Sequence, residues 1–363
     1  MTWAPYGPYW RQARRIYLNE IFTPKRLDSF EYIRVEERKT FISQLNSLDG
    51  NPFFLKDHLS RFSLCSMTRM VLSNKYFGES TVRAEDLQHL VDQWFLLNGA
   101  FNIGDWIPWH SLLDLQGYVK QMKALKISFD KFHNIVLDDH RAKMNEEKDM
   151  VDVLLQMAQD PTLEVKLTDD CVKGLMQDLL TGGTDSLTAA VQWAFQELLR
   201  QPRFIDKAIQ ELDQETLRLH TLGTMLAPHC AIEDCNVAGY DVEKGTTVLV
   251  NVWTIGRDPK YWDRAEEFLP ERFLEKDIDM DGHNFSFLPF GSGRSRCPGY
   301  SLGLKVIRAT LANMLHGFIW KLPQGMNTES ISVEEHYGLT THPKFPVPVI
   351  LEPRLSSHLY SPK

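Results

Sequence analysis

The chain has 363 residues, of which 43% are apolar and 11% aromatic, so it can bury a sizeable core and is not disordered in composition. Its formal net charge of −8 argues against nucleic-acid binding, which needs a basic face. The five cysteines are scattered and form no C-x-x-C pair, which predicts a reduced intracellular protein without a zinc site. No apolar run approaches the ~20 residues that span a bilayer.

The first part of the chain is expected to be helical, because apolar residues recur there at three- and four-residue spacing. Separate helices are predicted near residues 8–17, 24–47, 53–72, 84–99 and 113–145. Thr168 is a candidate N-cap, since Asp169 and Asp170 follow it in the first turn. One long helix is predicted from there to about Arg200.

The period of the apolar pattern changes to two after Cys235. Residues 236–240 and 246–251 alternate around turn residues, which predicts a small β-hairpin. A loop region rich in proline and glycine extends from 258 to 298, and a last helix and an extended tail follow. Because there is no repeat and no linker, we expect one mostly helical domain over residues 1–363.

The most informative segment is Pro289-Phe290-Gly291-Ser292-Gly293-Arg294-Ser295-Arg296-Cys297-Pro298-Gly299, just before the last predicted helix. Its glycines allow tight turns in which successive amide groups can point at one atom. A sulfur at a helix N-terminus meets unpaired N–H groups and the positive end of the helix dipole, which favour the thiolate. Cys297 is therefore a candidate metal ligand, although an isolated cysteine would more often be a buried structural residue.

This segment resembles the haem-binding loop of the cytochrome P-450 family, and further motifs of that family occur in the same order. The matching segments are Trp10-x-x-x-Arg14, Gly182-Gly183-Thr184-Asp185-Ser186, Glu215-Thr216-Leu217-Arg218 and Pro270-Glu271-Arg272-Phe273. The resemblance covers nearly the whole chain and implies the mainly α cytochrome P-450 fold, a helical domain with small β-sheets. Compared with the family, the N-terminal helices and part of the sheet are expected to be missing.

The resemblance implies that Cys297 is the thiolate ligand of a haem b iron. Trp10, Arg14 and His229 are then expected to contact the two haem propionates, which require cations or N–H donors. The other cofactor-binding positions implied by the family are Phe290, Gly293 and Gly299.

Asp185 and Ser186 are expected to deliver protons during oxygen activation, since they supply an acid and a hydroxyl. The two glycines before them each cost a helix about 1 kcal/mol relative to alanine, so they indicate either a closely packed helix or a cavity for O₂. Two positions depart from the family pattern. Ser186 replaces the usual threonine, and Ser295 replaces an arginine that contacts a propionate, for which the flanking arginines would have to compensate.

Glu215 and Arg218 are three residues apart and so share one helix face. Alone they would form a surface ion pair worth under about 1 kcal/mol, but the family pattern implies a buried network with Arg272. Compared with the family, a segment is missing just before Gln214. We therefore expect one continuous helix over 203–220, which would carry Glu215 and Arg218 away from Arg272 and leave this chain without activity.

Within the family, the chain is most similar to plant enzymes of specialised metabolism, and above all to the trimethyltridecatetraene (homoterpene) synthases of grasses, which cleave tertiary terpene alcohols oxidatively. A flavonoid hydroxylase is the alternative enzyme. An inactive truncated relic that binds haem poorly or not at all is the alternative to an enzyme, and a plain helical interaction module would explain none of the motifs. The pocket residues implied by the family are Leu179, Met225, Leu226, Leu339 and Thr340.

The resemblance also implies the co-reactants, the partners and the location. The co-reactants are O₂ and electrons from NADPH, which an NADPH–cytochrome P-450 reductase would supply. The expected substrate is small and apolar. The family works on the cytosolic face of the endoplasmic reticulum membrane; since no anchor precedes the first helix, this chain is expected to be soluble or peripheral.

Overall fold

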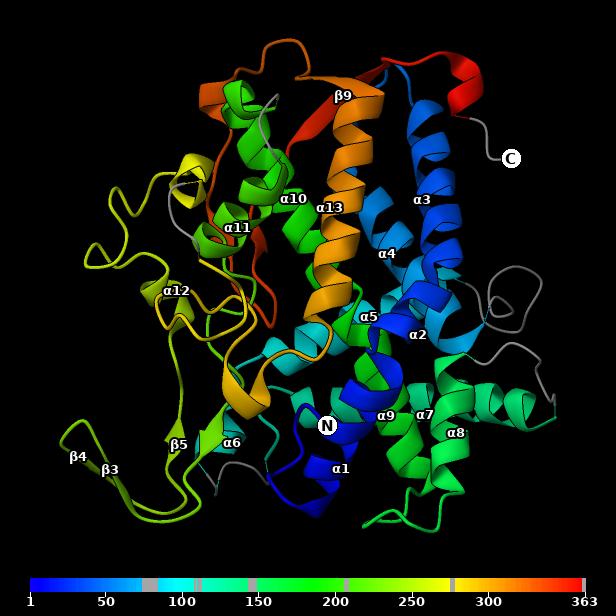
Figure 1. Ribbon diagram of the computed structural model, residues 1–363, viewed down its shortest axis with the longest axis vertical. Helices are drawn as coiled ribbons and strands as arrows, with labels where there is room; N and C mark the ends of the chain where they lie inside the picture. Colours follow the sequence, from blue (N-terminus) through cyan, green and yellow to red (C-terminus); the bar gives the residue numbers. More distant parts are fainter. Residues whose placement is uncertain are drawn as a thin grey trace. The chain divides into compact units, whose positions relative to one another are not determined.

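The computed structural model describes residues 1–73, 84–107, 109, 113–142, 149–205, 209–274 and 278–360 (Figure 1). This part of the chain divides into two compact units. The first contains Met1, Trp3–Ile205 and Pro298–Lys363, and the second contains Thr2 and Asp206–Cys297. The single domain over the whole chain stays a prediction.

The N-terminal part of the first unit is helical, as the periodicity predicts. Its elements are α1 (Pro8–Ile16), the π-helical turn η1 (Tyr17–Ile21), α2 (Pro24–Ser29), α3 (Glu31–Asn46), α4 (Leu55–Leu72), α5 (Ala84–Gly99), α6 (Ile103–Trp106), α7 (Tyr118–Ala142) and α8 (Met150–Ala158). The helix expected over 24–47 is broken at Phe30. The helix expected over 113–145 begins only at Tyr118, because Asp114 has a left-handed φ of 40°; positions 143–145 lie outside the described residues.

The long helix predicted after Thr168 is present as two helices, α9 (Asp169–Gly182) and α10 (Asp185–Arg200). Thr168 is the N-cap, as predicted, and its side chain accepts a hydrogen bond from the Cys171 amide at 3.3 Å. Helix α10 packs against α4 and against α13 (Tyr300–Gly317), which Figure 1 shows in front of it. Trp193 of α10 is fully buried, so this helix lies in the core of the first unit.

Short strands complete the first unit. β1 (Phe53–Phe54), β9 (Pro348–Pro353) and β6 (Phe318–Lys321) form an antiparallel sheet in the order β1-β9-β6. β7 (Glu335–His336) pairs with β8 (His342–Pro343). The extended tail predicted after the last helix is thus the part that forms most of these strands.

In its described residues, the second unit combines two helices with short strands and long loops. Its elements are α11 (Ile209–Leu219), β2 (His229–Cys230), β3 (Cys235–Val237), β4 (Tyr240–Val242), β5 (Thr247–Val248), α12 (Val252–Ile255) and the 3₁₀ turns η5 (Pro270–Phe273) and η6 (Gly293–Ser295). The rings of Trp262, Phe273 and Phe287 pack together with centroids 5.3–6.0 Å apart and form its apolar core.

The predicted hairpin is wrong in its pairing. β3 pairs with β4 across the two-residue turn Ala238–Gly239, whereas β5 pairs with β2. Both turn residues have positive φ, 51° and 90°, which is the turn geometry that suits the twist of a tight hairpin. Residues 236–240 therefore contain the turn, two residues of β3 and one residue of β4.

The continuous helix predicted over 203–220 is also wrong. A 3₁₀ turn, η4 (Pro202–Phe204), ends before the turn residue Ile205, and α11 is described from Ile209 onwards. Positions 206–208 of the predicted helix lie outside the described residues. Proline at the first position of η4 lacks an N–H and favours such a helix start over a helix interior.

Candidate functional site

The cysteine loop forms a tight turn at the end of the second unit. Gly291 and Gly293 have φ values of 72° and 60°, in the left-handed region that favours glycine. The Cys297 amide closes the turn by donating to the Phe290 carbonyl at 2.8 Å. Cys297 itself is exposed, so the loop presents this residue at the surface of its unit.

Arg296, which flanks the cysteine, is engaged inside the second unit. Its Nη2 atom donates to the Met280 carbonyl and to the Asp281 carboxylate, both at 2.9 Å. Its guanidinium is therefore committed to this segment, which argues against its replacing the arginine that the family has at Ser295. His229, another predicted donor for a propionate, is exposed on β2.

Glu215, Arg218 and Arg272 meet in the core of the second unit. Glu215 Oε2 lies 2.7 Å from Arg218 Nε, and Glu215 Oε1 lies 3.1 Å from Arg272 Nε. The Leu269 amide donates to the same Oε1 at 2.7 Å. The side chains of Glu215 and Arg218 are 0% exposed, and a charge so buried is tolerated only with partners of good geometry. The prediction that a continuous helix would keep Glu215 and Arg218 from Arg272 is therefore wrong.

Both arginines of this network also bind backbone carbonyls, which the motifs alone did not identify. Arg218 donates to the carbonyls of Gly256, Ala265 and Glu267. Arg272 donates to the carbonyls of Asp263, Arg264 and Glu267. A Cβ atom at Gly256 would lie 2.6 Å from the Arg218 carbonyl oxygen, so this close approach requires glycine. The network thus ties the irregular loop over 256–272 to helix α11.

The break between α9 and α10 lies at Gly183 and Thr184. A Cβ atom at Gly183 would lie 2.6 Å from Met67 Cε on α4, so this glycine allows close packing of that helix. Gly182 differs, because a Cβ atom there would meet nothing within 4 Å. Thr184 Oγ1 donates to the Thr181 carbonyl at 3.1 Å and so gives this carbonyl, in the last turn of α9, a hydrogen-bond partner. Close packing therefore explains Gly183, whereas Gly182 borders open space.

Asp185 and Ser186 lie in the first turn of α10. The Ser186 hydroxyl donates to the Gly182 carbonyl at 2.8 Å, across the break in the helix. Asp185 Oδ2 lies 2.9 Å from His342 Nε2, a contact that the sequence did not reveal. In the sequence, the one indication that His342 lies near the site was its position two residues after Thr340, a predicted pocket residue.

Trp10 and Arg14 lie on α1 in the first unit, and both are half-buried. The chain continues from α1 into η1, where the Tyr17 hydroxyl donates to the Leu175 carbonyl of α9 at 3.0 Å. Burial raises the pKa of Tyr17 well above its ordinary value, so the hydroxyl stays a donor. The helix with the two predicted propionate contacts is thus tied to the helix that precedes Asp185.

The predicted pocket residues are divided between the two units. In the first unit, Leu179 is buried on α9 and Thr340 is buried before β8, with Leu339 half-buried beside it. In the second unit, Met225 is 45% exposed and Leu226 is half-buried. Four of these five side chains are apolar.

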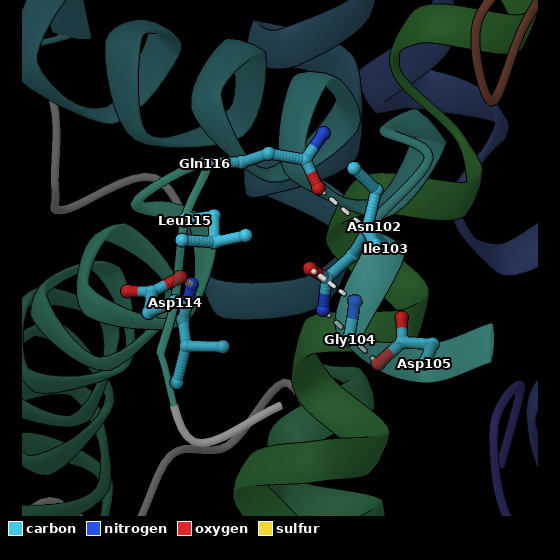
Figure 2. Close-up of a pocket in the computed structure, with 8 residues that line it drawn as sticks. Asn102, Ile103, Gly104, Asp105, Asp114, Leu115 and Gln116 are labelled. Atoms are coloured by element: carbon cyan, nitrogen blue, oxygen red, sulfur yellow. Dashed lines mark hydrogen bonds between the residues drawn. The ribbon is translucent and has the colours of Figure 1, made fainter. Parts of the chain in front are cut away.

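A small pocket of the first unit, shown in Figure 2, lies between α6 and the segment over 114–119. The Asn102 side chain accepts from the Gly104 amide at 3.3 Å and donates to Asp105 at 3.0 Å. Gln116 Oε1 accepts from the Ile103 amide at 2.8 Å. These polar groups satisfy one another, and none of the predicted site residues lines this pocket.

The family model described as Cytochrome P450 matches residues 2–214 and 214–347. The chain belongs to the cytochrome P450 family. The family members it resembles include two from Zea mays, trimethyltridecatetraene synthase and dimethylnonatriene synthase, each 38% identical over 99% of this chain and over 74% and 76% of those proteins. Flavonoid 3'-monooxygenase of Petunia hybrida is 35% identical over 99% of this chain and 77% of that protein.

Solved P450 structures confirm the predicted fold class. A zebra fish cytochrome P450 with abiraterone has a TM-score of 0.79 and 24% sequence identity, with 98% of this chain and 84% of that chain covered. The chain is therefore a mainly α P450 with small sheets, of a family of haem-dependent monooxygenases that receive electrons from a reductase. Within the described ranges, no helix is long and apolar enough to cross a bilayer.

The match to the P450 family model consists of two segments, and we call the point at which they meet the junction. The two matched segments meet at Gln214, and the alignment with trimethyltridecatetraene synthase runs over 409 residues although this chain has 363. The relative therefore has residues that this chain lacks, as the sequence predicted. Gln214 lies within α11, and its amide donates to the Ile278 carbonyl at 2.9 Å, so the helix passes through the junction.

The side chains at the predicted haem-binding positions are of types that suit a haem. Cys297, exposed on its glycine turn, offers the single thiolate that a P450 iron requires. The indole N–H of Trp10, the guanidinium of Arg14 and the imidazole of His229 offer donors for two propionate carboxylates. Gly182 adds a helix surface without a side chain.

Proposed function

We propose that this P450 is a monooxygenase of plant specialised metabolism that acts on an apolar terpenoid alcohol and cleaves a carbon–carbon bond to give a homoterpene. The observation that carries the proposal is the 38% identity to the two Zea mays synthases over 99% of the chain. A flavonoid hydroxylase is the second candidate, because the Petunia hybrida flavonoid 3'-monooxygenase is 35% identical over the same share.

The residues of the predicted pocket support an apolar substrate. Leu179, Met225, Leu226 and Leu339 would each offer apolar surface to a hydrocarbon, and burial of such surface is worth about 25 cal/mol per Å². Thr340 is the polar member of the set and could hold a substrate hydroxyl by a hydrogen bond.

In the proposed function, Cys297 would hold the haem iron through its thiolate, and Trp10, Arg14 and His229 would hold the propionates. When bound, the haem supplies the activation of O₂ with electrons from NADPH through a reductase. The family positions that would shape the loop around it are Phe290, Gly293 and Gly299. Glu215, Arg218 and Arg272 would fix the second unit, which carries that loop.

Asp185 and Ser186 are assigned to proton delivery. Asp185 supplies a carboxylate in the first turn of α10, and Ser186 supplies a hydroxyl beside the open face at Gly182. The Ser186 hydroxyl would have to leave the Gly182 carbonyl, 2.8 Å away, in order to pass on a proton. The reductase is the proposed protein partner, on the cytosolic face of the endoplasmic reticulum membrane.

The first experiment tests the haem site. The purified chain should give the carbon monoxide-difference spectrum of a thiolate-ligated haem after reduction, and Cys297→Ala should abolish this spectrum. Cys235→Ala is the matched control, because Cys235 is also an exposed cysteine of the second unit. An unchanged spectrum in the Cys297 variant would refute the ligand assignment.

The second experiment tests the substrate. NADPH-dependent turnover with added reductase is measured with tertiary terpene alcohols of the nerolidol type and, in parallel, with a flavonoid. Homoterpene formation supports the first candidate, and hydroxylated flavonoid alone supports the second. A chain that gives neither product and no thiolate–haem spectrum would be the inactive relic.

A further inference from the structure

The carboxylate of Asp185 is held by a histidine that belongs to none of the motifs. His342 Nε2 lies 2.9 Å from Asp185 Oδ2, and the two side chains are 13% and 20% exposed. An ionised carboxylate only accepts hydrogen bonds, so the hydrogen of this bond lies on Nε2. The other ring nitrogen, Nδ1, is buried and has no hydrogen-bond partner among the described residues. Asp185 is therefore the group that fixes the direction of the ring N–H.

The backbone that carries His342 is fixed against α10. Trp193, fully buried on α10, donates from Nε1 to the Thr341 carbonyl at 3.0 Å. Asp185 and Trp193 are eight residues apart and so share one face of the helix. Strand β8 begins with His342, which lies opposite His336 in the β7–β8 pair. The position of the imidazole is thus set by packing as well as by its hydrogen bond.

We propose that His342 is a positioning residue for Asp185: its Nε2–H holds the carboxylate toward β8 and controls when that carboxylate can move a proton. This inference rests on the proposed function, in which Asp185 serves proton delivery. The Ser186 hydroxyl is likewise occupied, by the Gly182 carbonyl. In the structure, the Asp185 carboxylate and the Ser186 hydroxyl therefore both have hydrogen-bond partners within the protein.

The charge of the Asp185 carboxylate also acts on a second carboxylate, Asp92. Burial raises the pKa of Asp92 on α5, and the charge of Asp185 raises it further. An ionised Asp185 therefore disfavours a charge on Asp92. The N–H of His342 holds the Asp185 carboxylate in place, and its loss should let the carboxylate turn away from its present direction.

The pairing is tested by a double-mutant cycle on the purified full chain. Urea unfolding is measured for Asp185→Asn, His342→Leu and the double variant. The unfolding constants should show a coupling of about fivefold to thirtyfold between the two changes. His336→Leu is the matched control, since His336 is the exposed partner of His342 in the strand pair and should not couple to Asp185.

The functional part of the test measures hydrogen peroxide and product per NADPH in the haem-loaded protein with reductase. His342→Leu should raise the ratio of peroxide to product by roughly tenfold. It should add nothing further when Asp185 is already asparagine. His342→Gln keeps an amide N–H that can reach the carboxylate and should restore most of the product. A merely structural contribution would lower stability without changing this ratio.

The outcomes separate this proposal from the proposed substrate. An absent coupling between Asp185 and His342 overturns it, whatever the turnover. An unchanged peroxide ratio in an active His342→Leu protein also overturns it. If the coupling is present but even the unmodified chain turns over no substrate, the substrate assignment fails and the pairing is supported.

Discussion

The buried carboxylate of Glu215 stabilises the second unit by neutralising two arginines at once. Glu215→Gln would keep the shape of the side chain but remove its charge. Arg218 and Arg272 would then face a neutral amide, while the first of them is 0% exposed and the second only 8% exposed. Water cannot replace the lost carboxylate at such sites, so both guanidinium groups would be left without a counter-charge.

The expected cost is large. Removal of one partner from a buried ion pair typically destabilises a protein by about 3–5 kcal/mol. Typical folding stability is about 5–15 kcal/mol, so this change would remove about a fifth of it or more. With a urea dependence of ~3 kcal/mol per M, the unfolding midpoint should fall by about 1 M or more.

Hydrogen exchange measured by mass spectrometry can locate this loss. Peptides from residues 209–274 should lose protection in Glu215→Gln, whereas those from α13 in the other unit should change less. Glu352→Gln is the matched control, because the Lys321–Glu352 pair at 2.5 Å is 51% and 46% exposed. Exposed pairs contribute about 0–1 kcal/mol, so this variant should barely differ. Equal effects of the two changes would refute the reasoning from burial.

Four further predictions follow from other contacts. Gly183→Ala should destabilise the chain by about 1–3 kcal/mol because its methyl would overlap a side chain of α4, whereas Gly182→Ala, beside open space, should be neutral or stabilise by up to about 1 kcal/mol in urea titrations. Burial lowers the pKa of His133 to about 4, so between that pH and the ordinary ~6.5 the unfolded chain binds a proton that the folded chain does not. Stability should therefore fall by about 2 kcal/mol from pH 7.5 to pH 5, and His133→Phe should abolish that part of the loss. Ser295→Arg should raise haem retention, since a charge-assisted hydrogen bond is worth about 1.5–3 kcal/mol; equal haem affinity in a titration would contradict this. Restoring the relatives' extra residues at Gln214 should raise NADPH-dependent turnover, and equal turnover would show that the junction is harmless.

The sequence predicted the helices best where periodicity and capping act locally. Thr168 could be predicted as an N-cap because the contact is local, and its hydroxyl accepts from the Cys171 amide, three residues on, at 3.3 Å. The close packing at Gly183 involves instead a distant side chain, Met67 of α4, which no local pattern could reveal. The strand pairing failed for a similar reason, because alternation marks a strand but does not select its partner. His229 pairs with Val248 and Cys230 with Thr247, 19 and 17 positions further on, and no local pattern links them.

Candidate site residues could be proposed from the sequence where a family motif includes them. Residues that only the fold brings to the site could not be proposed in this way. Cys297 and Asp185 could be named from short motifs. His342 could not, because its contact with Asp185 spans 157 residues and depends on how β8 packs against α10. Arg296 could be named as a possible substitute for the arginine that the family has at Ser295. Its hydrogen bond to Asp281, however, depends on how the loop folds.

The contacts around Gln214 show why the buried network of Glu215, Arg218 and Arg272 can form although relatives have additional residues. Among the described residues, the groups that bind Arg218 or Arg272 are Glu215, one residue after the junction, and the loop over 256–267. A helix can be shortened or joined at any residue without losing its backbone hydrogen bonds, because each bond spans only four residues. The Thr216 hydroxyl, for instance, donates to the Leu212 carbonyl at 2.7 Å, from one side of the junction to the other. The network therefore requires only that α11 persist from Glu215 to Arg218. The additional residues of the relatives are therefore not needed for this ion-pair network.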